Sequence, residues 1–313
     1  MSTTTRRDFL KTSALVGGGL LLTDPTSLLA QEATAQANMA ITHWDPALLP
    51  EADLAGVATR LTEATMEAMG GMGRFVSKGD VVWVKPNIGW NRRPELAANT
   101  NPDVVGTLVR LCLEAGAKSV KVGDHTCNPA RQCYRTSGIA KAAEDAGARV
   151  VYLDKKRFRD VKLGGEFLDE WPLYTEVMDA DLVLNVPVLK HHGLTEASMA
   201  MKNYMGIIGG QRNAWHQNMA ACLCDITRFM KPTITVLDAV RTLTAHGPQG
   251  GNPDDVKLVG TMAASTDIVA LDAFGASVLG HDPSAISNIQ AAHEQGLGTM
   301  DWSSLAPVER TLS

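Results

Sequence analysis

The sequence predicts an α/β fold with a mainly parallel sheet and helices on both faces. Stretches with apolar residues at helical spacing alternate along the chain with short apolar runs. Helices and strands in this order are typical of a parallel sheet that is covered on both sides. The 313 residues have an ordinary soluble composition, 45% apolar and 20% charged. We therefore expect a single α/β domain over residues 38–313.

The first half of that domain shows the alternation clearly. The stretch at residues 50–71 has helical spacing and ends at a glycine pair, and residues 79–87 form an apolar run that Pro86 ends. Residues 101–117 have a proline in the first turn and a glycine near the end, which favours a helix. The next predicted elements are a strand at 118–124, a helix at 138–148 and a strand at 149–154.

The segment near residues 155–178 interrupts the alternation, and we expect a small antiparallel excursion there. The α/β pattern then resumes. Strands are predicted at 181–189, 233–240 and 257–265, and helices at 219–230, 267–280 and 284–296. Ligands of open parallel sheets bind beyond the carboxyl ends of the strands, so we expect the functional residues there.

The N-terminus carries an arginine pair, Arg6 and Arg7, before the short apolar stretch TSALVGGGLLL. This pattern predicts a twin-arginine export signal over residues 1–37, with cleavage after the sequence AQA at 35–37. The apolar stretch is short for a membrane helix, so no stable membrane span is expected after cleavage. The expected location is periplasmic or extracytoplasmic, with the twin-arginine translocase as a transient partner. The alternative is an N-terminal helix that merely contains two arginines.

The net charge bears on nucleic-acid binding, and the cysteine content bears on disulfide pairing. The formal net charge is −5, and basic runs with interleaved aromatic residues are absent, so no nucleic-acid partner is expected. The five cysteines are an odd number for an oxidising compartment, and no CxxC pair occurs. At least one cysteine is therefore expected to be unpaired or to have another use.

Polar residues follow two of the predicted strands in the first half. Lys85 and Asn87 end one strand, where Lys85 is suited to bind an anion and Asn87 is suited equally to a tight turn. Asp124, His125 and Cys127 follow the next strand. These three are competent metal ligands, and Asp124 is also a suitable cap for the following turn.

The densest polar group follows the strand at 181–189. Lys190, His191 and His192 come first, and Lys202, Asn203 and His216 flank the glycine-containing segment around Gly206. A lysine removed from water has a lowered pKa and acts as a nucleophile or anchor, while neutral imidazoles act as bases or metal ligands. The alternative is that these side chains only solvate a surface loop.

Two further groups have competing interpretations. Asp238 and Arg241 lie near the end of the strand at 233–240, before a loop rich in glycine and proline, which is suited to carry binding groups or equally to form turns only. Cys222 and Cys224 lie in an apolar helical run, where they diverge around the helix and are expected to be buried structural thiols.

Seven blocks in order carry a family resemblance: WVKPN, PDVV, VGD, LNVPVLKHH, MKNYMG, LDAV with HGPQGG, and STDIVALDAFGA. Over roughly residues 75–295 the chain resembles the domain of unknown function 362 family. Many relatives carry ferredoxin-like cysteine clusters, but this chain has no CxxCxxC run, so we do not expect an iron–sulfur cluster in it.

A more distant resemblance concerns four residues. The order of His192, Lys202, Gly206 and His216 is similar to that of the histidine, cofactor-bearing lysine, glycine and histidine in nickel-pincer lactate racemases. The resemblance implies Lys202 as the attachment point of a nickel-pincer cofactor, with the two histidines as base or ligand. It also implies Lys85 or Arg241 as the clamp of a substrate carboxylate, so Arg241 is a second candidate anion clamp. The adjacent histidines and the glycine pattern differ from that family.

Together these observations predict an enzyme that acts on a small anionic substrate, with a metal ion or an organometallic cofactor. The alternative is a non-catalytic periplasmic accessory that binds a redox partner. The predicted catalytic residues are Lys190, His192, Lys202 and His216. The predicted substrate-binding residues are Lys85, Asn87, Asp124, Asn203 and Arg241. The candidate metal ligands are His125, His191, His192 and His216.

Overall fold

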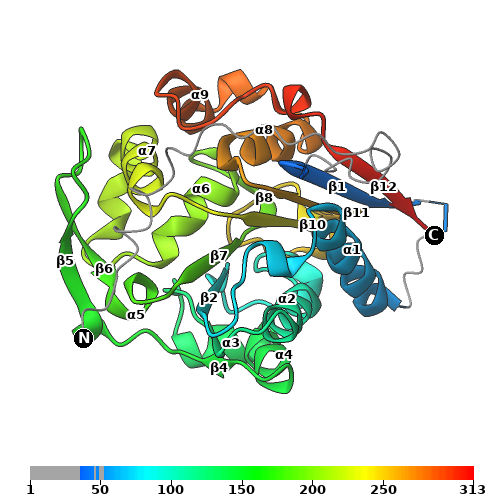
Figure 1. The fold of residues 1–313 in the computed structure, drawn as a ribbon. Helices are drawn as coiled ribbons and strands as arrows, with labels where there is room; N and C mark the ends of the chain where they lie inside the picture. Colours follow the sequence, from blue (N-terminus) through cyan, green and yellow to red (C-terminus); the bar gives the residue numbers. More distant parts are fainter. Residues whose placement is uncertain (1–35, 46, 49–52) are drawn as a thin grey trace, which may run out of the picture. The chain divides into compact units, whose positions relative to one another are not determined.

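One large mixed sheet passes through the middle of the described chain (Figure 1). The computed structural model describes residues 36–45, 47–48 and 53–313, so the predicted export signal lies outside them except for its last two positions. The strands on the main path are β1 Met39–Trp44, β2 Val81–Pro86, β3 Ser119–Val122, β4 Arg149–Val150, β7 Leu182–Val186, β10 Thr235–Leu243, β11 Val256–Ser265 and β12 Val308–Leu312. Their order is β12-β1-β11-β10-β7-β2-β3-β4.

The sheet is parallel on one side and antiparallel on the other. Strands β10, β7, β2, β3 and β4 pair in parallel, which confirms the predicted mainly parallel sheet. Strand β11 runs antiparallel to both β10 and β1, and β12 pairs in parallel with β1. A side branch is formed by β8 Val188–His192, which pairs with β10 and with β9 Glu196–Ser198.

The sequence did not predict the two strands β1 and β12. Strand β12 lies at the edge of the sheet, and its residues VERTL are exposed or half-buried. It therefore lacks the apolar run that marks the central strands. The expected strand at 149–154 is also shorter than predicted, because only Arg149–Val150 pairs at the opposite edge.

Helices cover both faces of the sheet, as predicted (Figure 1). One core packs under α1 Leu54–Ala68, α2 Pro102–Glu114, α3 Ala130–Thr136 and α4 Ile139–Asp145. The other packs under α5 Thr175–Met178, α6 Ala200–Asn203, α7 Met219–Met230, α8 Ile268–Val278 and α9 Ser287–Glu294.

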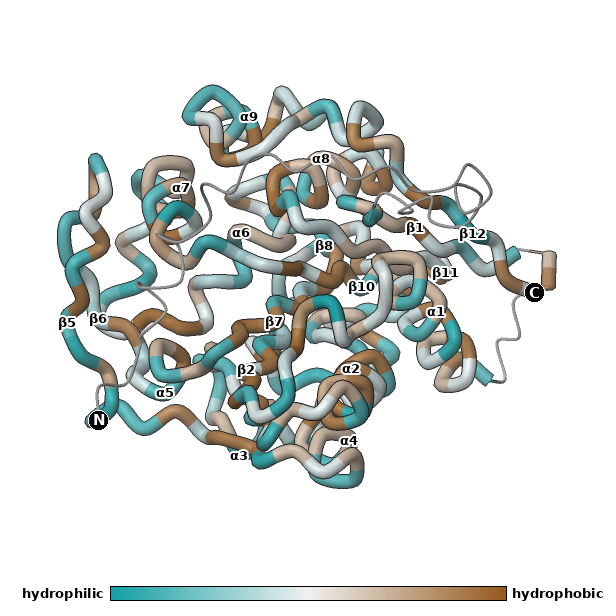
Figure 2. The backbone as a smooth tube through the Cα atoms, in the orientation of Figure 1, coloured by the Kyte–Doolittle hydropathy of each residue, from teal (hydrophilic) through white to brown (hydrophobic). Residues whose placement is uncertain are grey.

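Strand residues alternate between these two cores, because successive side chains on a strand point to opposite faces. In β2, Val82 and Val84 belong to the first core and Trp83 belongs to the second. The central strands β2 and β7 are accordingly hydrophobic along most of their length (Figure 2).

The predicted antiparallel excursion is a two-stranded sheet of β5 Phe158–Lys162 and β6 Glu170–Tyr174. This hairpin leads into α5 and packs beside the second core through Phe158 and Tyr174. Within the described residues, no helix has both the length and the apolar character needed to cross a membrane.

The short helix α6 is held in place by a buried carboxylate. Asp272 of α8 accepts the backbone N–H groups of Ala200 at 2.6 Å and Met201 at 3.0 Å. Burial raises the pKa of Asp272 to about 7, and the two N–H groups oppose that rise. Because Lys202 and Asn203 lie in the same single turn, Asp272 fixes the backbone that carries them.

Candidate functional site

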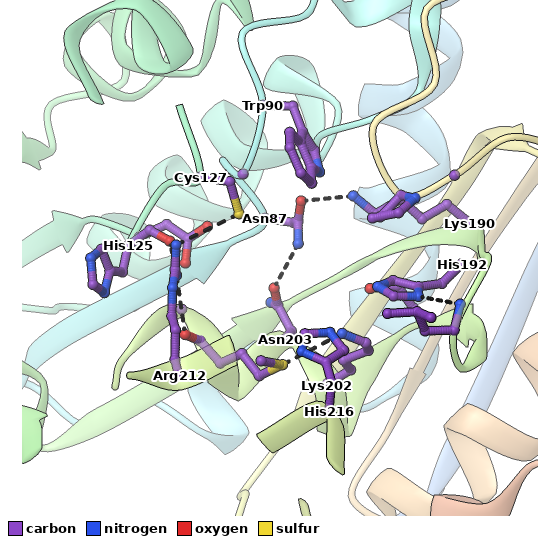
Figure 3. A pocket seen from close by; sticks show the side chains of 18 of the residues that line it. Asn87, Trp90, His125, Cys127, Lys190, His192, Lys202, Asn203, Arg212 and His216 are labelled. Carbon is purple, nitrogen blue, oxygen red and sulfur yellow. Dashed lines mark hydrogen bonds between the residues drawn. The ribbon is translucent and has the colours of Figure 1, made fainter. Parts of the chain in front are cut away.

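A cavity of about 470 Å³ lies at the carboxyl ends of β2, β3 and β8 (Figure 3). It brings together the four residues predicted to be catalytic, and four of the five predicted to bind substrate. Lys85 and Asn87 come from the end of β2, Asp124 and His125 from the end of β3, and Lys190 and His192 from β8. The other predicted residues in its lining are Lys202, Asn203 and His216.

The floor of the cavity is a buried ion pair. Lys85 Nζ lies 2.7 Å from Asp124 Oδ1, and it also donates to Asn203 Oδ1 at 2.8 Å. Burial lowers the pKa of Lys85, and the Asp124 carboxylate opposes this effect. Asp124 Oδ2 accepts the N–H of Ile88 at 2.6 Å. Both charges therefore have partners in the protein.

Gly206 is required by this ion pair. A Cβ atom at position 206 would lie 1.7 Å from Asp124 Oδ1 and 2.5 Å from Lys85 Nζ. Any side chain there would displace the pair, so the glycine that the sequence placed among the candidate residues has a steric role.

Two more lysines project into the cavity without an acidic partner. Lys190 Nζ donates to Asn87 Oδ1 at 3.1 Å and to the carbonyl of Ala98 at 2.5 Å. Lys202 Nζ has Met205 Sδ at 3.4 Å, a weak acceptor. No described carboxylate lies within salt-bridge distance of either ammonium group.

Burial is the main reason why the ammonium groups of Lys190 and Lys202 have lowered pKa values. Burial, together with the smaller effect of the Lys202 charge, lowers the pKa of Lys190 to about 7, and the charge of Asp124 opposes this change. Burial also lowers the pKa of Lys202 to about 8. An anion that entered the cavity would restore the charged form of both lysines, because an opposite charge nearby stabilises it.

His192 and His216 stack beside these lysines, with ring centroids 5.8 Å apart and ring planes 22° apart. Burial and the neighbouring Lys202 lower the pKa of His192 to about 3, and the same two causes lower the pKa of His216. Both rings are therefore neutral at pH 7.

The hydrogen bonds of the two rings assign opposite tautomers. His192 Nδ1 accepts the N–H of Leu194 at 3.2 Å, so its proton is on Nε2. His216 Nδ1 lies 3.1 Å from the carbonyl of Asn213 and must donate to it, which leaves a lone pair on Nε2. One imidazole is thus a proton donor and the other a proton acceptor.

Strand geometry explains why His192 lines the cavity and His191 does not. Alternate residues of β8 point to one face, which places Lys190 and His192 together and His191 opposite. His191 Nδ1 accepts the N–H of Gly247 at 3.1 Å. Gly247 is close to this strand, because a Cβ atom there would meet the carbonyl of His191 at 1.9 Å.

The structure does not bring Arg241 into the cavity. It lies in a separate shallow hollow with Leu54, Glu95 and Pro253, so the predicted second anion clamp is away from the lysines. His125 does line the cavity, and its Nδ1 donates to the carbonyl of Ile208 at 2.7 Å. Burial and the Arg212 guanidinium lower the pKa of His125.

The four candidate histidines do not form a metal centre by themselves. Within the described residues, no group of three or more His, Cys, Asp or Glu side chains is arranged to hold a metal ion. His192 and His216 offer two imidazoles, so further donors to a metal at this site would come from water or from a bound group.

Sequence reasoning missed Arg212. Its guanidinium donates to the carbonyls of His125 and Thr126, and it lies 3.6 Å from Cys127 Sγ. Arg212 follows the glycine pair Gly209–Gly210 after one intervening residue, and a basic residue this close to a glycine pair is the signal that could have identified it. All five cysteines are free, and Cys127 is exposed at the cavity wall.

Comparison with known proteins gives three findings. The family model described as "Domain of unknown function (DUF362)" matches residues 82–277. The thylakoid-associated protein sll1697 of Synechocystis sp. (strain ATCC 27184 / PCC 6803 / Kazusa) is 30% identical over 240 residues, which cover 74% of this chain and 73% of that protein.

Among solved structures, the lactate racemase apoprotein from Thermoanaerobacterium thermosaccharolyticum aligns with a TM-score of 0.45 and 11% identity. The alignment covers 76% of this chain and 56% of the racemase, so the chain spans little more than half of that protein. The family match extends over most of the chain and includes the strands and loops that line the cavity. The protein belongs to the DUF362 family.

Proposed function

We propose that this protein is an enzyme that binds a small anionic substrate through Lys190 and Lys202 and transfers a proton through His192 and His216. One observation carries the proposal: the cavity is lined by four cationic side chains and one carboxylate, although the whole chain has a net charge of −5. The single carboxylate, Asp124, is already paired with Lys85. The positive charge that is left over would stabilise a bound carboxylate or phosphate.

The two imidazoles suit an acid–base reaction on that anion. The unprotonated Nε2 of His216 would accept a proton from the substrate, exchange it with solvent and return it, while the Nε2–H of His192 would donate a hydrogen bond to the oxygen on which negative charge develops. Their lowered pKa values keep both rings neutral, so His216 is in the form of a base and His192 in the form of a neutral hydrogen-bond donor. Lys190 and Lys202 would hold the substrate's anionic group and stabilise negative charge that develops during the transfer.

Deuterium exchange tests this reaction class directly. Lactate, malate and other small 2-hydroxy acids would be incubated with the protein in D₂O, and loss of the C2–H signal would be followed by NMR. We expect exchange with wild type, loss of exchange but retained binding in His216→Asn, and weak binding in Lys202→Met. Binding without exchange for every acid tested would support the non-catalytic accessory instead. If no acid binds and no acid exchanges, the lysines and histidines of the cavity form a polar cluster with a structural role only.

The alternative role that we propose for Lys202 is the attachment point of an organic or organometallic cofactor, in which case Lys190 alone would hold the substrate anion. The amine of Lys202 lines the cavity and has Met205 Sδ as its hydrogen-bond partner among the described residues, and its lowered pKa makes the unprotonated amine, which is able to form a covalent bond, more abundant than in a solvated lysine. Such a group would supply a Lewis-acidic metal, for which His192 or His216 would provide an imidazole donor. Intact-mass and elemental measurement of protein purified from its native route tests this: unmodified Lys202 and no bound metal would contradict it.

We also propose that the protein reaches the periplasm by twin-arginine export. The support is the Arg6–Arg7 pair before a short apolar stretch. Replacement of both arginines by lysine should keep the protein in the cytoplasmic fraction at its full, uncleaved mass. Replacement of Lys11 by arginine, just outside the pair, should leave export unchanged, and export of the double-lysine variant would contradict the proposal.

A further inference from the structure

A second cavity of about 780 Å³ lies beside the first and shares part of its lining. The shared lining consists of His125, Cys127, Arg212 and Asn213. Figure 3 shows His125, Cys127 and Arg212 together on one side of the first cavity. The second cavity is otherwise lined by Lys155, Phe158, Gly209, Gly210, Gln211, Ala214 and Gln217.

The described lining of the second cavity favours an anion. It contains the cations Lys155 and Arg212 and the amide side chains of Gln211, Asn213 and Gln217, and no aspartate or glutamate. Ammonium, guanidinium and amide N–H groups are the donors that bind carboxylates and phosphates in proteins. Like the first cavity, the second therefore has more cationic than acidic side chains in its described lining, but it lacks the pair of neutral imidazoles.

Arg212 connects the two cavities electrostatically. Its Nη1 donates to the carbonyls of His125 and Met205, and its Nη2 donates to the carbonyl of Thr126 at 2.6 Å. These acceptors are neutral, so they hold the guanidinium in place without cancelling its charge. A cation in the shared lining attracts anions in both cavities.

The hairpin and a glycine pair shape the floor of the second cavity. Gly209 packs against the ring of Phe158, and a Cβ atom there would lie 2.8 Å from Phe158 Cδ1. Gly210 has a φ of +64°, a conformation that other residues adopt with strain. Lys155 begins the 3-10 helix Lys155–Arg157 just before β5, and it is exposed at the cavity edge.

We propose that the second cavity binds an additional oxyanion, a phosphate or carboxylate, on the same ligand whose first anionic group enters the Lys190–Lys202 cavity. The substrate or cofactor is then an elongated molecule with anionic groups at both ends. This inference rests on the proposed function in one respect, namely that the first anionic group of the ligand binds in the Lys190–Lys202 cavity.

A series of ω-phosphonocarboxylates with one to six methylene groups, together with the matching dicarboxylates, tests the spacing. In wild type, one chain length should bind about tenfold tighter by calorimetry than propionate or methylphosphonate alone. Lys155→Gln should remove most of that advantage. Lys156→Gln, a change at an exposed neighbour outside the cavity lining, should preserve it. The phosphonate and carboxylate arms distinguish which oxyanion is preferred.

A flat series, in which no chain length exceeds the single anions, would overturn the inference. A flat series could also arise because the first site fails to bind. Methylphosphonate is therefore also titrated into Lys202→Met, in which the first cavity has lost a cation. Binding that remains there and depends on Lys155 supports the second site even if the proposed function fails. No binding of methylphosphonate to this variant, with the fold intact by circular dichroism, excludes the second site.

Discussion

Two clusters of basic side chains lie at different places along the same sheet, and they differ in how their charges are balanced. At α5, Glu176 is almost fully buried and accepts hydrogen bonds from Lys121 at 2.7 Å, from Arg149 and from Arg157. Burial would raise the pKa of Glu176, and the three cations more than reverse this, so the pKa is lowered. Both of its carboxylate oxygens are used.

The cavity cluster has the opposite balance. Lys85 and Asp124 pair with each other, while Lys190, Lys202 and Arg212 bond only neutral acceptors in the described part of the chain. Buried cations without an acidic partner cost desolvation free energy that the fold must offset elsewhere. The difference indicates that the Glu176 cluster stabilises the fold, whereas the cavity cluster is arranged for an anion from outside.

The largest expected effect concerns the floor of the cavity. Gly206→Ala places a Cβ atom 1.7 Å from Asp124 Oδ1, so the buried ion pair must separate. We expect the free energy of unfolding to fall by about 3 kcal/mol, measured by urea denaturation. Gly73→Ala is the control, because a Cβ atom there meets nothing within 4 Å and should change stability little. Equal stability of the two variants would show that the floor is not tightly packed.

A pair of substitutions should separate the two clusters. Lys202→Met removes an unbalanced cation, so propionate affinity should fall about 30-fold while thermal stability stays equal or rises. Glu176→Gln leaves three cations without their acid, and it should lower the free energy of unfolding by about 2 kcal/mol with unchanged propionate affinity. Calorimetry and thermal denaturation of both variants measure this. If the two variants behaved alike, the proposed distinction between the clusters would be wrong.

Anion binding should depend on pH with a sign set by the lysines. Lys190, with a pKa of about 7, and Lys202, with a pKa of about 8, are cationic below those values and neutral above them. Propionate is ionised from pH 6 to 9, so its affinity should fall by at least about tenfold across that range. A pH-independent affinity would show that neither lysine holds the anion.

The smallest expected effects are at the two predicted residues that the fold places elsewhere. Arg241→Gln and His191→Asn should each change propionate affinity by less than about twofold, because neither side chain lines the cavity. His192→Asn is the matched comparison on the same strand, and it should abolish proton exchange. A large loss of affinity in Arg241→Gln would mean that its hollow contributes to the same ligand site.

Much of the fold could be predicted from local pattern. The central strands β2 and β7 are continuous apolar runs, and the hairpin at β5 and β6 interrupts the alternation in composition. The edge strands were harder to predict, since β12 has exposed or half-buried residues and no apolar run. The antiparallel direction of β11 also could not be predicted, because strand direction depends on the path between strands and not on their residues.

The candidate site was likewise predictable in part from the sequence. Parallel strands place their carboxyl ends at one edge, so Lys85, Asp124 and Lys190 could be expected to meet there. Arg212 and His216 reach the same cavity from the 3-10 helix Arg212–Gln217, and the glycine pair before this segment indicates a close backbone approach but not the place where the segment packs. The choice of His192 over His191 follows from the two-residue period of β8, but only once its inward face is known.

The sequence by itself determined which segments form the central strands, which polar residues end them and where glycine allows close approach. Only the tertiary structure decided which charges are balanced. Asp124 neutralises Lys85 but not Lys190 or Lys202, because ion pairing falls off within a few ångströms and depends on side chains from separate segments. That assignment is what distinguishes a structural lysine from one that is free to bind a ligand.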